Sequence, residues 1–127
     1  MILVDTSVLV DYLRAPSDRV LQILEAHAAI CGVIYAEILA GARSRSDAAR
    51  FAAALDGLQY LPTPEAAWED LGDNLARLRA AGISVPLSDA LIATLAIEND
   101  LEVWTRDGHF ERIRLAIPSL KLLPEPV

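Results

Sequence analysis

The chain opens with Ile2-Leu3-Val4-Asp5-Thr6-Ser7-Val8-Leu9, in which three apolar residues precede an aspartate and the beginning of a helical pattern. A short run that is apolar at every position is typical of a strand buried on both of its faces. The apolar spacing over residues 8–13 then predicts a helix. A buried strand that passes directly into a helix indicates an α/β fold with a parallel sheet.

The same alternation of strand and helix continues along the whole chain. Further short strands are predicted at 30–33, 58–61, 102–105 and 120–123. Helical patterns lie between them, at 20–24, 35–42, 47–55, 65–81, 89–98 and 110–114. The sequence therefore predicts a single domain over residues 1–127, a three-layer α/β/α fold with a central parallel sheet of about five short strands.

The composition is that of a globular domain with a full core. The chain has 127 residues, of which 54% are hydrophobic and 23% charged, so a disordered chain is excluded. The single cysteine, Cys31, lies in an apolar run and is expected to be a small buried hydrophobe. The apolar stripe of the helix at 65–81 includes Trp68, which we expect to be a core residue or a dimer contact.

The charge balance limits the partners that the protein can have. Eighteen acidic residues against eleven basic ones give a net charge of −7, so a general nucleic-acid binder is disfavoured. A polyanion would have to be engaged through a metal site or a small arginine cluster. The first residues lack a basic region of the kind that opens a signal peptide, and no apolar run is long enough to span a membrane, so we expect a cytoplasmic protein.

Four acidic residues stand where a parallel sheet forms its sites. Asp5, Glu37 and Asp107 each follow a predicted strand, and Asp89 opens a predicted helix. Ligands of such sheets bind beyond the carboxyl ends of the strands. The helical neighbours of Glu37 and Asp89 are apolar or small, so each of these carboxylates needs a partner from elsewhere in the fold or a metal ion if it is buried.

A divalent cation would resolve the repulsion among these acids. Two carboxylates at about 4 Å repel by about 4 kcal/mol at an effective dielectric constant of about 20. Clusters of carboxylate oxygens suit Mg²⁺ or Mn²⁺ rather than zinc. Such ions activate water and shield phosphate charge, so an acidic protein can act on a polyanion through them.

The four acids lie in four short segments, each with its own pattern. In chain order they are Asp5-Thr6-Ser7-Val8-Leu9-Val10-Asp11-Tyr12-Leu13, Ala36-Glu37-Ile38-Leu39-Ala40-Gly41, Ser88-Asp89-Ala90-Leu91-Ile92-Ala93 and Thr105-Arg106-Asp107-Gly108-His109-Phe110. Their order and spacing resemble the motifs of PIN-domain ribonucleases, in particular VapC-type toxins of bacterial toxin–antitoxin pairs. The resemblance covers nearly the whole chain.

The resemblance implies an acidic metal site formed by Asp5, Glu37, Asp89 and Asp107. Asp5 and Asp89 would be direct ligands of Mg²⁺ or Mn²⁺. Glu37 and Asp107 would act on the metal through water, or would orient the attacking water.

The resemblance also assigns the hydroxyl groups, the reaction and the partners. Thr6, Ser7 and Thr105 would hold the carboxylates or the substrate phosphate. The reaction would be endonucleolytic hydrolysis of single-stranded RNA that leaves a 5′-phosphate. The partner would be a cognate VapB-type antitoxin whose tail covers the active site, and the assembly would be a homodimer.

The chain departs from the family pattern at a few positions. Many members have a further acid two residues after the fourth, where this chain has His109, which we expect to contact phosphate or to pack beside Phe110. Cys31 stands where a serine or threonine is common. Asp11 is expected to be structural, because a helix would turn it away from Asp5. Five arginines are candidate contacts for RNA phosphates: Arg14, Arg43, Arg45, Arg106 and Arg112.

Three other kinds of protein remain as alternatives. A phosphoaspartyl enzyme related to the haloacid dehalogenases needs a second Asp where Ser7 stands, and a lysine that Lys121 is badly placed to supply. A receiver-type signalling domain needs an acidic residue adjacent to Asp5. A non-catalytic interaction module would keep the fold without the activity.

Overall fold

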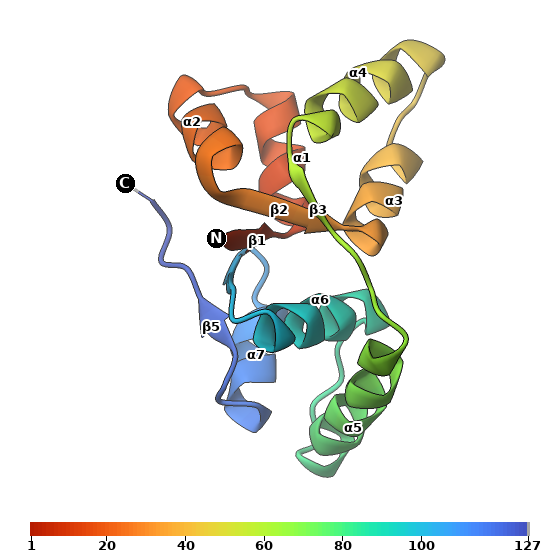
Figure 1. Cartoon of the computed structure of the whole chain (residues 1–127), viewed down its shortest axis with the longest axis vertical. Coiled ribbons are helices and arrows are strands. Elements are labelled where there is room, and N and C mark those ends of the chain that lie inside the picture. The colour runs from red at the N-terminus through yellow and green to blue at the C-terminus, as the bar shows by residue number, and fades with distance from the viewer. Residues whose placement is uncertain (127) are drawn as a thin grey trace.

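The computed structural model describes residues 1–126 and contains a five-stranded parallel sheet in the order β3-β2-β1-β4-β5 (Figure 1). The strands are β1 (Ile2–Val4), β2 (Ala28–Cys31), β3 (Gln59–Leu61), β4 (Glu102–Trp104) and β5 (Lys121–Leu122). The first strand lies at the centre, where Ile2 pairs with Ala28 on one side and with Glu102 on the other. The predicted parallel sheet is confirmed. The predicted domain boundary at Val127 lies outside the described residues.

Helices cover both faces of the sheet (Figure 1). One layer contains α1 (Thr6–Arg14), α2 (Asp18–His27), α3 (Gly32–Ala40) and α4 (Arg45–Asp56). The other layer contains α5 (Ala66–Ala80), α6 (Leu87–Glu98) and α7 (His109–Ala116). The predicted three-layer arrangement is therefore confirmed. The described residues include no helix that is long and apolar enough to cross a membrane.

The core forms around the central strands, which are apolar throughout, and around α6, which is apolar at most positions. Every residue of β1 and β2 is buried, as expected for strands between two helical layers. In α6 the eight residues Asp89–Ala96 are all buried, because this helix packs against α5, α7 and β4. The predicted burial of Cys31 is confirmed, and that burial raises the pKa of its thiol.

Two details of the prediction are wrong. The second strand begins at Ala28, two residues before the predicted start, and α3 begins already at Gly32. A Cβ atom at Gly32 would lie 2.8 Å from the hydroxyl of Tyr60, an exposed side chain of β3, so a larger residue here would displace that side chain. Trp68 is 54% exposed and is not a core residue, because Ala67 takes the buried position on α5. The predicted dimer contact of Trp68 stays a prediction.

Candidate active site

Asp5 follows β1 at the centre of the sheet and is held by two hydroxyl groups. Its Oδ2 accepts hydrogen bonds from Ser7 Oγ at 2.9 Å and from Thr105 Oγ1 at 2.8 Å. Among the described residues, the Asp5 side chain does not cap helix α1, although it stands at the N-cap position. The side chain is only 4% exposed, so these two bonds compensate for the loss of water around a buried carboxylate.

Backbone N–H groups fix the direction of both hydroxyl protons. Ser7 Oγ accepts from the backbone N–H of Arg106 at 3.0 Å, and Thr105 Oγ1 accepts from that of Asp107 at 3.0 Å. Each hydroxyl has one proton, and the accepted bond leaves that proton free to point at Asp5. The loop after β4 therefore holds Asp5 in place through two small side chains.

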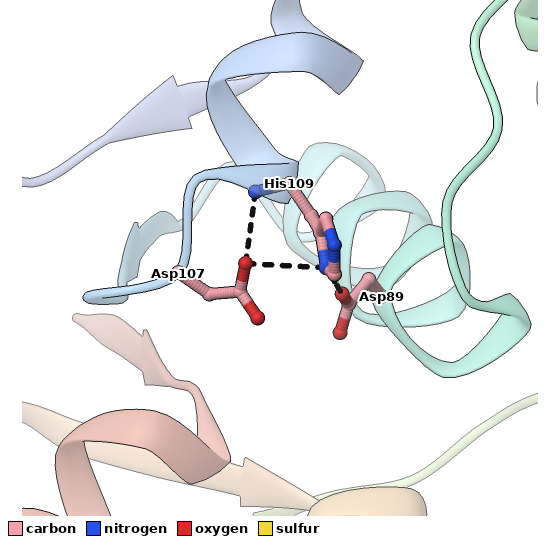
Figure 2. A group of neighbouring side chains, drawn as sticks. All are labelled: Asp89, Asp107 and His109. Atoms are coloured by element: carbon pink, nitrogen blue, oxygen red, sulfur yellow. Dashed lines mark hydrogen bonds and ion pairs between the residues drawn. The ribbon is translucent and has the colours of Figure 1, made fainter.

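Asp89, Asp107 and His109 converge at the neighbouring position (Figure 2). His109 Nδ1 lies 2.7 Å from Asp89 Oδ2 and 3.1 Å from Asp107 Oδ1. Asp107 Oδ1 also accepts the backbone N–H of His109 at 2.9 Å. The imidazole thus lies between two carboxylates that come from different elements, the loop after β4 and the first turn of α6. Neither expected role of His109, phosphate contact or packing beside Phe110, describes this bridging position.

The surroundings of Asp89 disfavour the negative charge of its carboxylate. Burial raises the pKa of Asp89, the hydrogen bond with His109 opposes that rise, and the nearby charges of Asp5 and Asp107 add to it. The three acids are therefore close enough to repel one another. A positive group between them would be favourable.

Glu37 lies at one side of this centre and is exposed. It projects from α3, and its Oε1 accepts a hydrogen bond from Thr6 Oγ1 at 3.0 Å. The bond links Glu37 to the residue directly after Asp5. Glu37 is therefore open to solvent and has a partner from elsewhere in the fold, Thr6 of α1.

Arg106 is occupied by two carboxylates. Its Nη1 lies 2.9 Å from Asp11 Oδ2 and its Nε lies 2.5 Å from Glu125 Oε1. Glu125 also accepts the indole N–H of Trp104 at 2.8 Å. The structural role predicted for Asp11 is confirmed by its pairing with Arg106. This arginine joins α1 to the C-terminal segment and has no free charge for a phosphate in this arrangement.

The donor atoms of the site fit a divalent cation. One ligand atom each from Asp89, Asp107 and His109 can lie within 4.8 Å of one another. Carboxylate oxygens are the ligands that Mg²⁺ and Mn²⁺ prefer, and an imidazole nitrogen is compatible with a transition metal. Asp5 adds a further carboxylate next to this group, while Glu37 stands farther along the edge. The structure thus brings all four predicted acids to the carboxyl edge of the sheet, with Asp89, Asp107 and His109 in closest contact.

Two functional contacts escaped the sequence prediction. The bridge from His109 to both carboxylates could have been suspected, because an imidazole two residues after Asp107 is within reach of that side chain. The Arg106–Glu125 pair had no signal in the sequence, since these residues meet only through the path of the C-terminal segment beside β4.

Comparison with known proteins places this geometry in a family. The PIN domain model matches residues 2–115. Ribonuclease VapC11 from Mycobacterium tuberculosis is 34% identical over 122 residues, which cover 89% of this chain and 91% of that protein. A VapC ribonuclease from Mycobacterium bovis, Mb1587, gives the same values.

Solved structures share the fold. DNA-bound VapBC from Salmonella typhimurium matches with a TM-score of 0.80 and 22% identity, covering 96% of each chain. VapBC2 from Rickettsia felis, bound to a promoter DNA fragment, matches with a TM-score of 0.78 and 24% identity, covering 97% of this chain and 98% of that one. From the family model and the curated relatives, this chain belongs to the PIN-domain family and, within it, to the VapC ribonucleases.

Proposed function

We propose that the acidic edge is the active centre of a divalent-metal-dependent endoribonuclease, the toxin of a toxin–antitoxin pair. The observation that carries the proposal is the convergence of Asp5, Asp89 and Asp107 at strand and helix ends. Three carboxylates that repel one another in this way suit a site that works with a bound cation. Membership among the VapC ribonucleases supports RNA as the substrate.

We propose Mg²⁺, or Mn²⁺ in its place, as the cofactor. Asp5, Asp89 and Asp107 would hold the ion, and Glu37 would act from the edge through water. A bound divalent ion supplies charge neutralisation at the phosphate and lowers the pKa of a water ligand.

The other residues of the site position these groups. Ser7 and Thr105 fix the position of the Asp5 carboxylate, because each donates its only proton to the same carboxylate oxygen. Thr6 does the same for Glu37. His109 holds Asp89 and Asp107 together when the cation is absent, and it must release at least one of them to admit a ligand between them. Arg106 anchors the loop after β4 by its ion pairs with Asp11 and Glu125.

The partners follow from the relatives. Solved structures with this fold include toxin–antitoxin complexes, so we propose a VapB-type antitoxin as the inhibitor and single-stranded regions of cellular RNA as the target. We further propose that residues 1–127 act as one domain, that the protein is a homodimer, and that it works in the cytoplasm.

The alternatives have less support. A phosphoaspartyl mechanism lacks a proton donor, because the side chain two residues after Asp5 is Ser7, whose proton points at Asp5. Lys121 is bound to Asp100 at 2.5 Å and follows a different strand, β5. A non-catalytic module has no need of two hydroxyl groups that fix the position of the Asp5 carboxylate.

A cleavage map tests the proposal. The protein would be induced in a bacterial host, and new 5′-phosphate RNA ends would be sequenced for wild type, Asp5→Ala and Asp89→Ala. Sharp ends that appear only with wild type are expected. In vitro, the purified wild type should cut the same RNA with Mg²⁺ and not with EDTA. Equal ends from all three proteins, or cutting that survives EDTA, would overturn the proposal.

A further inference from the structure

A groove of about 630 Å³ is lined by residues of α1, α3 and α4. These three helices lie in the same helical layer (Figure 1). Glu37 is among the residues that line the groove, and Glu37 is bonded to Thr6, the residue after Asp5, so the groove adjoins the acidic edge. Its inner surface is apolar, formed by the buried Ile38 and the half-buried Val10, Leu13 and Phe51. An opening of this kind can receive an extended chain that also reaches the carboxylates.

Three exposed arginines line the outer part of the groove: Arg14 from α1, Arg43 from the loop before α4, and Arg50 from α4. The chain has ten arginines and one lysine, and its net charge is −7. Three cations in one groove of such an acidic protein are a local exception. The acids that share the lining are Glu37 and Asp47, so the cations outnumber them.

These arginines have charge available for a ligand. Among residues 1–126, Arg14 and Arg43 make no ion pair, and Arg50 makes a loose one with Asp47 at 3.5 Å, with both side chains partly or largely exposed. The guanidinium of Arg50 also lies 5.2 Å from the centroid of the Phe51 ring, which holds it over the apolar surface. Arg106, in contrast, is held by two carboxylates.

We infer that this groove binds the single-stranded RNA next to the bond that is cut, with Arg14, Arg43 and Arg50 on its phosphates. This inference rests on the proposed function and names the path of its substrate. Cations around an apolar floor suit a single strand, because unpaired bases can lie on the floor while the backbone meets the cations. A duplex hides its bases and has no use for the floor.

The test compares two triple variants in a protein that cannot cut the probe. Asp89→Asn is the background, and Arg14→Ala, Arg43→Ala and Arg50→Ala are added to it together. The control adds Arg19→Ala, Arg77→Ala and Arg79→Ala, which remove the same charge from exposed positions on α2 and α5. Fluorescence anisotropy then measures binding of a short labelled single-stranded RNA of mixed sequence, in Mg²⁺ and over a range of salt concentrations.

The groove variant should lose at least about tenfold in RNA affinity, and the slope of log K against log salt should become shallower by about 2. The control should change affinity by less than about twofold, because its charges lie outside the groove and are screened. Equal affinities for the two triple variants would overturn the inference. So would a loss of affinity for a poly-glutamate peptide without any loss for RNA, which would assign the groove to a protein ligand.

A second measurement separates this inference from the proposed function. With Asp89 restored, the groove variant should raise KM for RNA about tenfold while kcat stays within about twofold, since ground-state binding alone is lost. If wild type failed to cut any RNA, the proposed function would be overturned, while the binding comparison would still decide the role of the groove. A fall in kcat at unchanged KM would contradict the inference.

Discussion

The acidic edge of the sheet and the acidic pair of Asp70 and Glu98 differ in how their carboxylates are held. Asp70 lies on α5 and Glu98 on α6, and both residues, called the outer pair below, are exposed. The Asp70 carboxylate raises the pKa of Glu98 to about 7, mainly through a hydrogen bond that requires a proton between the two groups. At the acidic edge, Asp5 instead accepts hydrogen bonds from two hydroxyl groups, and Asp107 accepts one from a backbone N–H.

The difference shows what distinguishes a site from a cluster of charge. The outer pair relieves its repulsion by binding a proton from solvent. The inner group consists of Asp5, Asp89, Asp107 and His109. Hydroxyl, backbone N–H and imidazole groups hold its carboxylates in position before a cation binds. Substitutions in the two groups should therefore have different effects on activity and stability.

Removing one acid from each group should affect catalysis very differently. Asp5→Asn or Asp89→Asn should lower the rate of RNA cleavage by at least about 1,000-fold, because each removes a charge from the metal site. Asp70→Asn should leave the rate within about twofold of wild type. Cleavage rates of purified proteins in Mg²⁺ check this, and an active Asp89→Asn enzyme would contradict the assigned site.

Removing the donor that fixes Asp5 should give a smaller loss. Thr105→Val keeps the shape of the side chain but leaves the Oδ2 atom of Asp5 with one hydroxyl partner. We expect a loss of about 10- to 100-fold in metal affinity or activity, the usual effect of a residue that orients a metal ligand. Thr105→Ser should restore most of it. If Val and Ser behaved alike, the hydroxyl would not be the group that matters.

The sequence predicted where the acidic residues of the site lie, but it did not predict the hydrogen bonds between them and His109. The apolar strand 2–4 and the acids after it determine where the carboxyl edge lies, and the structure brings Asp5, Asp89 and Asp107 there. Such positions follow from strand ends, which local patterns reveal. The bridge made by His109 depends on the distance between α6 and α7, which only packing determines.

The errors in the predicted fold also arise because tertiary packing is not visible in local sequence patterns. The apolar stripe at 65–81 includes Trp68, but Ala67 is also at helical spacing from Leu71 and Leu78, so spacing alone does not decide which of residues 67 and 68 is buried. In the structure Ala67 is buried with Leu71 and Leu78, whereas Trp68 is exposed.

A bound divalent cation should stabilise the folded wild-type protein through Asp5, Asp89 and Asp107. In the absence of metal, Asp89→Asn should not lower the free energy of unfolding. The raised pKa means that the folded protein disfavours the charged form of Asp89, so this residue contributes stability at low pH that is lost as the pH rises through its folded-state pKa. Without metal at neutral pH, Asp89→Asn should therefore be no less stable than wild type.

Calorimetric unfolding with and without Mg²⁺ checks this prediction. Mg²⁺ at about 100 times its Kd should raise the free energy of unfolding of wild type by about 2.7 kcal/mol, and that of Asp89→Asn by much less. Glu98→Gln is the matched control and should respond to Mg²⁺ as wild type does. A metal-free Asp89→Asn protein that unfolds far more easily would show that the carboxylate is a structural group instead.

The smallest effect concerns the outer pair and its proton. The pKa of Glu98 is about 7 in the folded protein against 4.5 for an unperturbed glutamate, so the folded state binds more protons between these values. The stability from the shared proton is complete below pH 4.5 and is lost as the pH rises through about 7. Because both side chains are exposed, we expect a change of at most about 1 kcal/mol. Glu98→Gln, which keeps a donor for Asp70, should remove the pH dependence, and unfolding by urea at pH 5.5 and pH 8 measures it. A stability that instead increases over this range in wild type, and not in Glu98→Gln, would mean that no proton holds the pair together.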